Sequence, residues 1–125
     1  MKYYLFIATL LGICSACEKS TNPFTISSNS IGLLTDSTKF KDLKAVFIKD
    51  SLSRHIAGDE FTGTTNTISV YEKISGKLLL ELDPEHSLDS LSTIRTVRIM
   101  DSRFKNKDDL NIHSTFGDFS SKYQI

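Results

Sequence analysis

Residues 66–83, NTISVYEKISGKLLLELD, decide the fold of this chain, because two segments of alternating apolar residues flank Ser75 and Gly76. Alternation with a period of two is typical of strands, and a Ser-Gly pair between two such segments indicates a hairpin turn. A two-residue loop of Ser75 and Gly76 would place Val70 opposite Glu81, which mixes charge into the apolar face. This register is therefore not expected.

A three-residue loop at residues 74–76, with the glycine in the left-handed conformation, gives a consistent hairpin. It places Ile68 opposite Leu82 and Val70 opposite Leu80, so that the apolar side chains share one face. The other face is then predicted to carry Ser69, Tyr71, Lys73, Lys77, Leu79 and Glu81.

Two further strands are predicted, one on each side of the hairpin. Residues 51–57 form the first, and a Gly- and Thr-rich loop leads from it into the hairpin. Residues 93–101 form the second, after a connection that begins near Pro84. The residues expected on one face are Leu52 and Ile56 in the first strand, and Val97 and Ile99 together with Arg95 in the second.

A helix is predicted before these strands, within residues 33–47. Asp36 or Ser37 is expected to cap it, because a short polar side chain accepts hydrogen bonds from the first free amide groups of a helix. Four apolar residues then fall on one face of the helix, and we expect them to cover the sheet. They are Phe40, Leu43, Val46 and Phe47.

Short elements are predicted near both ends of this region. Residues 24–28 alternate and predict a first strand, and near the C-terminus Ser114 is expected to cap a second helix. Its apolar positions are Phe116, Phe119 and Tyr123. The sequence thus predicts an α+β fold: an antiparallel meander sheet of about four to five strands, packed by one or two short helices.

The two predicted helical regions resemble each other weakly. Each has a Ser-Thr pair, an aromatic residue at helical spacing and an Asp-apolar pair, Asp42-Leu43 in the first and Asp118-Phe119 in the second. Chance can produce this similarity, since Ser-Thr is a common helix cap. If the repeat is genuine, the second unit stops at Ile125 and the chain corresponds to a truncated two-unit protein.

Residues 1–17, MKYYLFIATLLGICSAC, have the layout of a secretory signal. A basic start leads into an apolar run at residues 5–13, which is too short to span a bilayer as a helix. The ending of two small residues and Cys17 resembles the lipobox of bacterial lipoproteins, although Cys14 stands where that family commonly has leucine. The resemblance implies cleavage after Ala16, lipidation of Cys17 and attachment to a lipid bilayer.

The domain organisation follows from this resemblance. Residues 1–16 are predicted to be the lipoprotein signal peptide, residues 17–23 a lipidated tether, and residues 24–125 a single small α+β domain. The alternative is an ordinary signal peptide whose removal leaves Cys17 as a free thiol. An aspartate after the cysteine would resemble an inner-membrane retention signal, and since Glu18 stands there, the outer membrane is the expected location.

Three short motifs resemble the O-glycosylation site of secreted Bacteroidetes proteins, in which an Asp precedes Ser or Thr and then a hydrophobic residue or Thr. Together with the lipobox-like Cys17, they make the chain similar to a lipoprotein of the Bacteroidetes type. For the mature domain the residues indicate no family. The motifs are Asp36-Ser37-Thr38, Asp50-Ser51-Leu52 and Asp89-Ser90-Leu91.

Charge and cysteine content exclude some classes of protein. The chain has 15 Lys and Arg and 15 Asp and Glu, and loss of residues 1–16 removes one Lys, which leaves a net charge of −1. Such a chain has no basic field for nucleic acid, so no nucleic-acid partner is expected. Cys17 is the only cysteine left after cleavage, so stability must come from packing and not from a disulfide.

The sequence holds no pattern that indicates catalysis or metal binding. The histidines, His55, His86 and His113, are far apart and fit no metal-ligand spacing, and no serine lies in a nucleophile motif. We therefore expect no catalytic residue, no metal and no cofactor. The predicted function is that of a membrane-anchored envelope lipoprotein acting as a non-catalytic binding or assembly module.

The candidate binding residue is Phe61, an aromatic side chain on a Gly-flanked loop, with a sheet face as the other candidate surface. The expected partner is an envelope protein or a glycan, and an immunity or inhibitor lipoprotein would be a special case. The alternative is a small hydrolase or glycan-processing enzyme that uses dispersed carboxylates such as Asp59, Glu60 and Asp83. Two convergent carboxylates in a pocket would favour the enzyme, and a flat patch around an exposed aromatic residue would favour binding.

Overall fold

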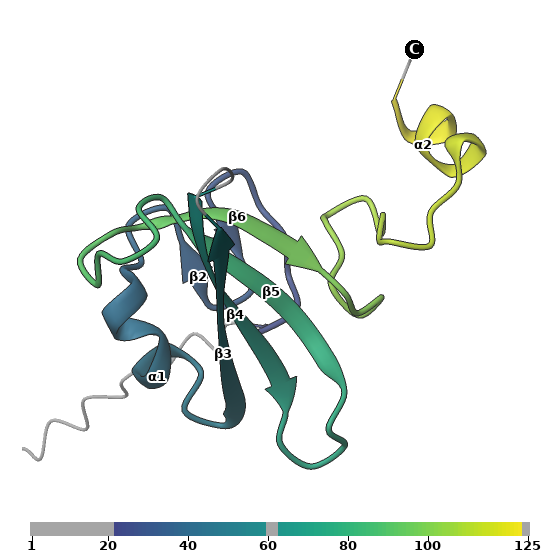
Figure 1. The fold of residues 1–125 in the computed structure, drawn as a ribbon. Coiled ribbons are helices and arrows are strands. Elements are labelled where there is room, and N and C mark those ends of the chain that lie inside the picture. The colour runs from purple at the N-terminus through teal and green to yellow at the C-terminus, as the bar shows by residue number, and fades with distance from the viewer. Residues whose placement is uncertain (1–21, 60–62, 124–125) are drawn as a thin grey trace, which may run out of the picture.

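The computed structural model describes residues 22–59 and 63–123. Its centre is a four-stranded sheet in which each strand pairs antiparallel with the next along the chain (Figure 1). The predicted antiparallel meander is therefore confirmed. The strands are β3 (Asp50–Asp59), β4 (Gly63–Glu72), β5 (Leu78–Pro84) and β6 (Ile94–Ile99).

The other elements are short. A two-stranded sheet of β1 (Ser30–Ile31) and β2 (Leu34–Thr35) precedes a 3-10 helix, η1 (Phe40–Asp42), which runs directly into α1 (Leu43–Val46). The last element described is α2 (Phe116–Lys122). One meander sheet, a small second sheet and short helices together confirm the predicted α+β class.

The hairpin of β4 and β5 has the predicted pairing away from its turn, but the predicted three-residue loop is wrong, because the Glu72 amide donates to the Lys77 carbonyl and the loop spans residues 73–76. Ile68 lies opposite Leu82, and Val70 lies opposite Leu80. Gly76 in the turn has a φ of 70°, the left-handed conformation expected there. The apolar alternation of the two strands thus sets the register of the sheet.

A β-bulge beside this turn reverses the predicted side of Leu79. Val70 pairs with Leu80 but Tyr71 pairs with Leu78, so Leu79 is one residue too many for a regular ladder. The Leu79 side chain turns into the core and is only 4% exposed. Its predicted placement on the other face is wrong, because a prediction from strict alternation cannot detect an inserted residue.

A second irregularity corrects the face predicted for Arg95. Asp83 pairs with Thr96 while Pro84 pairs with Ile94, which leaves Arg95 as the extra residue of β6. The Arg95 side chain is exposed and does not share the apolar face. The residues of β6 that pack against the core are Ile94, Val97 and Ile99.

The first helical region begins later than predicted. Neither Asp36 nor Ser37 caps it, because Lys39 is extended and pairs with Thr93, and helical structure starts only at Phe40. No side-chain hydrogen bond caps this start. The predicted apolar face is confirmed: Phe40, Leu43 and Phe47 are buried, and Val46 is half-buried against them.

The predicted first strand, residues 24–28, forms only isolated bridges, at Thr25 and Ile26. The reversal after β1 lies at Gly32, which has a φ of 57°. A Cβ on Gly32 would lie 2.2 Å from the carbonyl oxygen of Pro23. Only glycine permits this close approach, which holds the start of the described chain against the β1–β2 turn.

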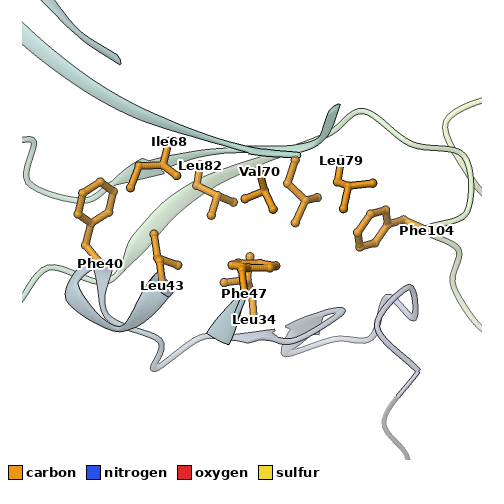
Figure 2. Packing of buried hydrophobic residues seen from close by; sticks show 10 residues of the cluster. Leu34, Phe40, Leu43, Phe47, Ile68, Val70, Leu79, Leu82 and Phe104 are labelled. Carbon is orange, nitrogen blue, oxygen red and sulfur yellow. The ribbon is translucent and has the colours of Figure 1, made fainter. Parts of the chain in front are cut away.

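The core lies between one face of the sheet and the segment from β2 to α1 (Figure 2). Side chains from β4 and β5 point toward Phe40, Leu43 and Phe47, and Phe104 closes one end of the row. Burial of such side chains supplies the main favourable free energy of folding. The buried apolar residues are Leu34, Phe40, Leu43, Phe47, Ile68, Val70, Leu79, Leu80, Leu82 and Phe104.

The second predicted helix forms, but it lies away from the sheet (Figure 1). Thr115 caps it in place of Ser114: Thr115 Oγ1 accepts from the Asp118 amide, and the Asp118 carboxylate accepts from the Thr115 amide. Of the two helical regions, only the first therefore packs on the sheet. The apolar positions of α2 stay exposed, Phe116 at 75%, Phe119 at 45% and Tyr123 at 37%.

Candidate binding groove

An apolar groove of about 400 Å³ opens between α1, the β1–β2 turn and the ends of β3 and β4. This volume lies in the usual range of ligand and side-chain binding pockets. The wall consists mainly of apolar side chains, with three charged residues beside them. The lining residues are Pro23, Phe24, Leu33, Val46, Phe47, Ile48, Leu79 and Phe104, with Lys49, Asp50 and Glu72.

Asp50 is the carboxylate of this groove that has no partner among residues 22–59 and 63–123. Its side chain makes no hydrogen bond and no ion pair with the residues that the structure describes. Burial raises the pKa of Asp50, and the neighbouring charge of Glu72 raises it further, while Arg103 acts in the opposite direction. Asp50 thus lacks a direct counter-charge among the described residues, although Lys49 also lines the groove and the charge of Arg103 acts on Asp50 from a distance.

Glu72 lies directly opposite Asp50 in the ladder of β3 and β4, but its charge is already balanced. Arg103 Nη1 donates to Glu72 Oε1 at 2.8 Å, and the Ser75 hydroxyl donates to the other oxygen. Both hydrogen bonds lower the pKa of Glu72, that of Arg103 most. The two acids of the groove thus differ, since Glu72 is paired and Asp50 is free.

Arg103 also holds one wall of the groove in place. Its guanidinium carbon lies 4.5 Å from the centre of the Phe24 ring, and Phe24 meets Phe104 edge-on at 5.0 Å between ring centres. Asp101, whose side chain is fully buried, accepts from Arg103 Nη2 at 2.9 Å and lies 3.3 Å from Lys77 Nζ. Hydrogen bonding from Arg103 lowers the pKa of Asp101 to about 2.

The opposite face of the sheet carries a polar network. Asp83 is part of this network, and its carboxylate is paired. Thr67 Oγ1 donates to Asp83 Oδ1 at 2.6 Å, and Arg98 donates to Asp83 at 2.8 Å and to Glu81 at 2.9 Å. Burial opposes ionisation of Asp83, but the hydrogen bonds from Thr67 and Arg98 outweigh it and lower its pKa. Asp83 therefore stays charged and is bound within the network.

The other residues singled out from the sequence do not gather into one site. Cys17, Glu60 and Phe61 lie outside the described residues, as does the side chain of Asp59, although β3 and β4 stay paired as far as Asp59 and Gly63. Within the described chain, no group of three or more His, Cys, Asp and Glu residues could hold a metal ion. The histidines are distributed over β3 (His55), the loop after β5 (His86) and the segment before α2 (His113).

The sequence contained a signal for the groove acids, although the predicted strand at residues 51–57 begins one residue after Asp50. Continuing the alternation by one step beyond Leu52 and Val70 reaches Asp50 and Glu72, on the apolar face and at its edge. Two acids at the end of the apolar alternation indicate that the core ends there and that charged side chains lie beside it. Their apolar surroundings could not be predicted, because Pro23, Leu33 and Phe104 come from distant parts of the chain.

Comparison with protein families, with curated proteins and with solved structures gives no match for this chain. In the described residues, no helix has the length and apolar character needed to cross a membrane. The groove and its charges therefore carry the functional argument.

Proposed function

We propose that this chain is a membrane-anchored lipoprotein of the bacterial outer membrane whose folded body is a non-catalytic binding module. Its partner is an envelope protein that inserts an apolar side chain, with a Lys or Arg next to it, into the groove. One observation carries the proposal: the carboxylate of Asp50, which pairs with no residue in the described part of the chain, lies at the edge of an apolar groove.

The groove matches such a partner in two ways. Its apolar wall would stabilise a buried Phe or Leu side chain by about 1.5–3 kcal/mol. Asp50 has lost part of its water without gaining a cation, and a Lys or Arg from the partner would compensate for this loss. A partner with an acidic residue at the same place would be repelled, which gives the groove selectivity.

The groove is also formed before any partner arrives. Arg103 holds Phe24 against Phe104, and Gly32 lets the chain at Pro23 approach the β1–β2 turn closely. A preformed wall reduces the conformational entropy that binding would otherwise lose. Such a wall favours recognition of a defined side chain over nonspecific apolar contact.

The lipid proposed at Cys17 would keep this groove near a membrane surface. Pro23, in the wall of the groove, follows Cys17 by only six positions. A chain of that length spans at most about 20 Å. Partners in or on the same membrane would thus meet the groove at a high effective concentration.

Two dipeptide probes test the binding function. N-acetyl-Phe-Lys-amide and N-acetyl-Phe-Glu-amide differ in the charge of one side chain, and each is titrated against the full chain in phospholipid nanodiscs. We expect Phe-Lys to shift the methyl NMR signals of Leu33, Val46 and Leu79, and Phe-Glu to bind about tenfold more weakly, a difference of about 1.4 kcal/mol.

Asp50→Asn should remove the preference for the Lys probe. Glu81→Gln, on the opposite face of the sheet, is the matched control and should leave the preference intact. Equal binding of both probes to the unchanged protein, or methyl signals that do not move with either, would overturn the proposed function.

A small hydrolase is the second candidate function, because Asp50 and Glu72 face the same groove and their pKa values move in opposite directions. A general acid and a general base require such a difference. The mainly apolar wall offers few polar groups to orient a sugar. This composition favours the non-catalytic binding module over the hydrolase. Hydrolysis of a chromogenic glycoside or ester by the unchanged chain, lost in both Asp50→Asn and Glu72→Gln, would decide for the enzyme.

A further inference from the structure

We propose that the segment bound in the groove is α2 of a second copy of this chain. The inference rests on the proposed function, since it names the partner of the same groove. Its basis is that one chain carries both halves of an interface: an exposed aromatic helix, and an apolar groove with an unpaired acid. In a reciprocal dimer, each helix would fill the groove of the other copy.

The apolar side of α2 has no cover within the described chain. Phe116, Phe119 and Tyr123 follow one another at spacings of three and four, which places them on one side of the helix. Phe116 is 75% exposed, and the rings of Phe119 and Tyr123 lie 4.8 Å apart between centres. A preformed aromatic stripe of this kind is typical of helices that bind in apolar grooves.

Local hydrogen bonds attach α2 to the turn that precedes it. The Tyr123 hydroxyl donates to Asp108 Oδ2 at 2.5 Å and accepts from Asn106 Nδ2 at 3.3 Å. Asn106 Oδ1 also accepts from the amides of Asp108 and Leu110, which fixes the turn before the helix. The helix is thus attached to its own linker and lies away from the sheet (Figure 1), which leaves its aromatic side open to a second molecule.

Size and charge fit the groove. A helix of seven residues is about 10 Å long, and a groove of about 400 Å³ lies within the usual size range of pockets that accept a ligand or side chain. Lys122 follows Phe119 by three positions and makes no ion pair with any described residue. The charge of Lys122 lowers the pKa of Asp109 from a distance, but no described acid contacts Lys122 directly, so Lys122 of one copy would form a direct ion pair with Asp50 of the other.

Disulfide trapping between two tagged copies in cell membranes tests the dimer. One copy carries Ile48→Cys in the groove wall, and the other carries Phe116→Cys on α2; both positions are exposed, at 77% and 75%. Mild oxidation should produce a disulfide that joins the two tags. Leu88→Cys, 71% exposed in the loop after β5 and away from the groove, is the matched control and should yield at least tenfold less product with Phe116→Cys.

A charge exchange separates specific docking from chance collision. Asp50→Lys alone or Lys122→Asp alone should reduce trapping severalfold, and the two together should restore it. Trapping at the control level, or a disulfide within one chain that carries both cysteines, would overturn the dimer. If the Phe-Lys probe binds the groove while no disulfide joins the tags, the dimer fails and the binding function stands.

Discussion

At the scale of single residues, the pKa values of two acids, Asp101 and Asp50, are shifted in opposite directions. Asp101 is fully buried and bound by Arg103 and Lys77, so its charge is compensated. Asp50 is half-buried beside Glu72 and accepts from no donor in the part of the chain that the structure describes. We expect the first to stabilise the fold and the second to be retained for binding.

Asp101→Asn is expected to lower the free energy of unfolding by about 2 kcal/mol near neutral pH, because it leaves Arg103 without its buried partner. The pKa of Asp101 is about 2 in the folded chain and 3.8 ordinarily. Its stabilisation is therefore present above about pH 4 and is lost as the pH falls toward 2. Urea unfolding at both ends of this pH range measures the difference. The free energies of unfolding of the parent and of Asp101→Asn should become equal near pH 2.

The control for Asp101 is Asp109→Asn. Asp109 is exposed and pairs with Lys105 at 2.9 Å on the surface, so we expect little change in stability. A loss for Asp101→Asn that keeps its full size in acid would contradict the assignment of the stabilisation to the carboxylate charge.

Asp50→Asn is expected to raise the free energy of unfolding slightly, by less than about 1 kcal/mol near neutral pH. A raised pKa means that the folded state holds the proton more tightly than the unfolded state does. Stability therefore falls as the pH rises from the ordinary value through the raised pKa, and the variant avoids this loss. Thermal unfolding across this range measures the difference, and a variant less stable than the parent would show that Asp50 serves the fold.

At the scale of elements, the β1–β2 turn allows a sharp test. Gly32→Ala should lower the free energy of unfolding by more than about 2 kcal/mol, because the new Cβ would meet the Pro23 carbonyl in addition to the strain of a positive φ. Gly76→Ala shares the positive φ but meets no atom within 4 Å, so it should cost only about 1 kcal/mol. Equal losses on urea unfolding would show that the approach of Pro23 to this turn does not matter.

The regular part of the sheet could be predicted because its alternation is unbroken. The pairing of Ile68 with Leu82 follows from the apolar pattern alone. Leu79 and Arg95 were misplaced, since each is the extra residue of a bulge and a strict period assigns it to the wrong face. The start of the helix at Phe40 could not be predicted, because Lys39 before it pairs with Thr93. This contact is distant in sequence and leaves no local pattern.

At the scale of the whole molecule, the same apolar spacing has two different outcomes. Phe40, Leu43 and Phe47 cover the sheet, whereas Phe116 and Phe119 remain exposed. A sequence pattern indicates an apolar side of a helix but not what covers it, and for this reason the packing of α2 could not be predicted. The groove was missed for a related reason, because its wall joins residues from Pro23 to Phe104.

We propose above all that this folded domain works while attached to a membrane through Cys17. The most direct measurement is labelling of cells with radioactive palmitate, together with fractionation of the full chain and its Cys17→Ser variant. We predict label on the unchanged chain, its recovery in the outer-membrane fraction, and loss of label in the variant. An unchanged chain that takes up no palmitate, or a variant labelled as strongly as the parent, would contradict the account.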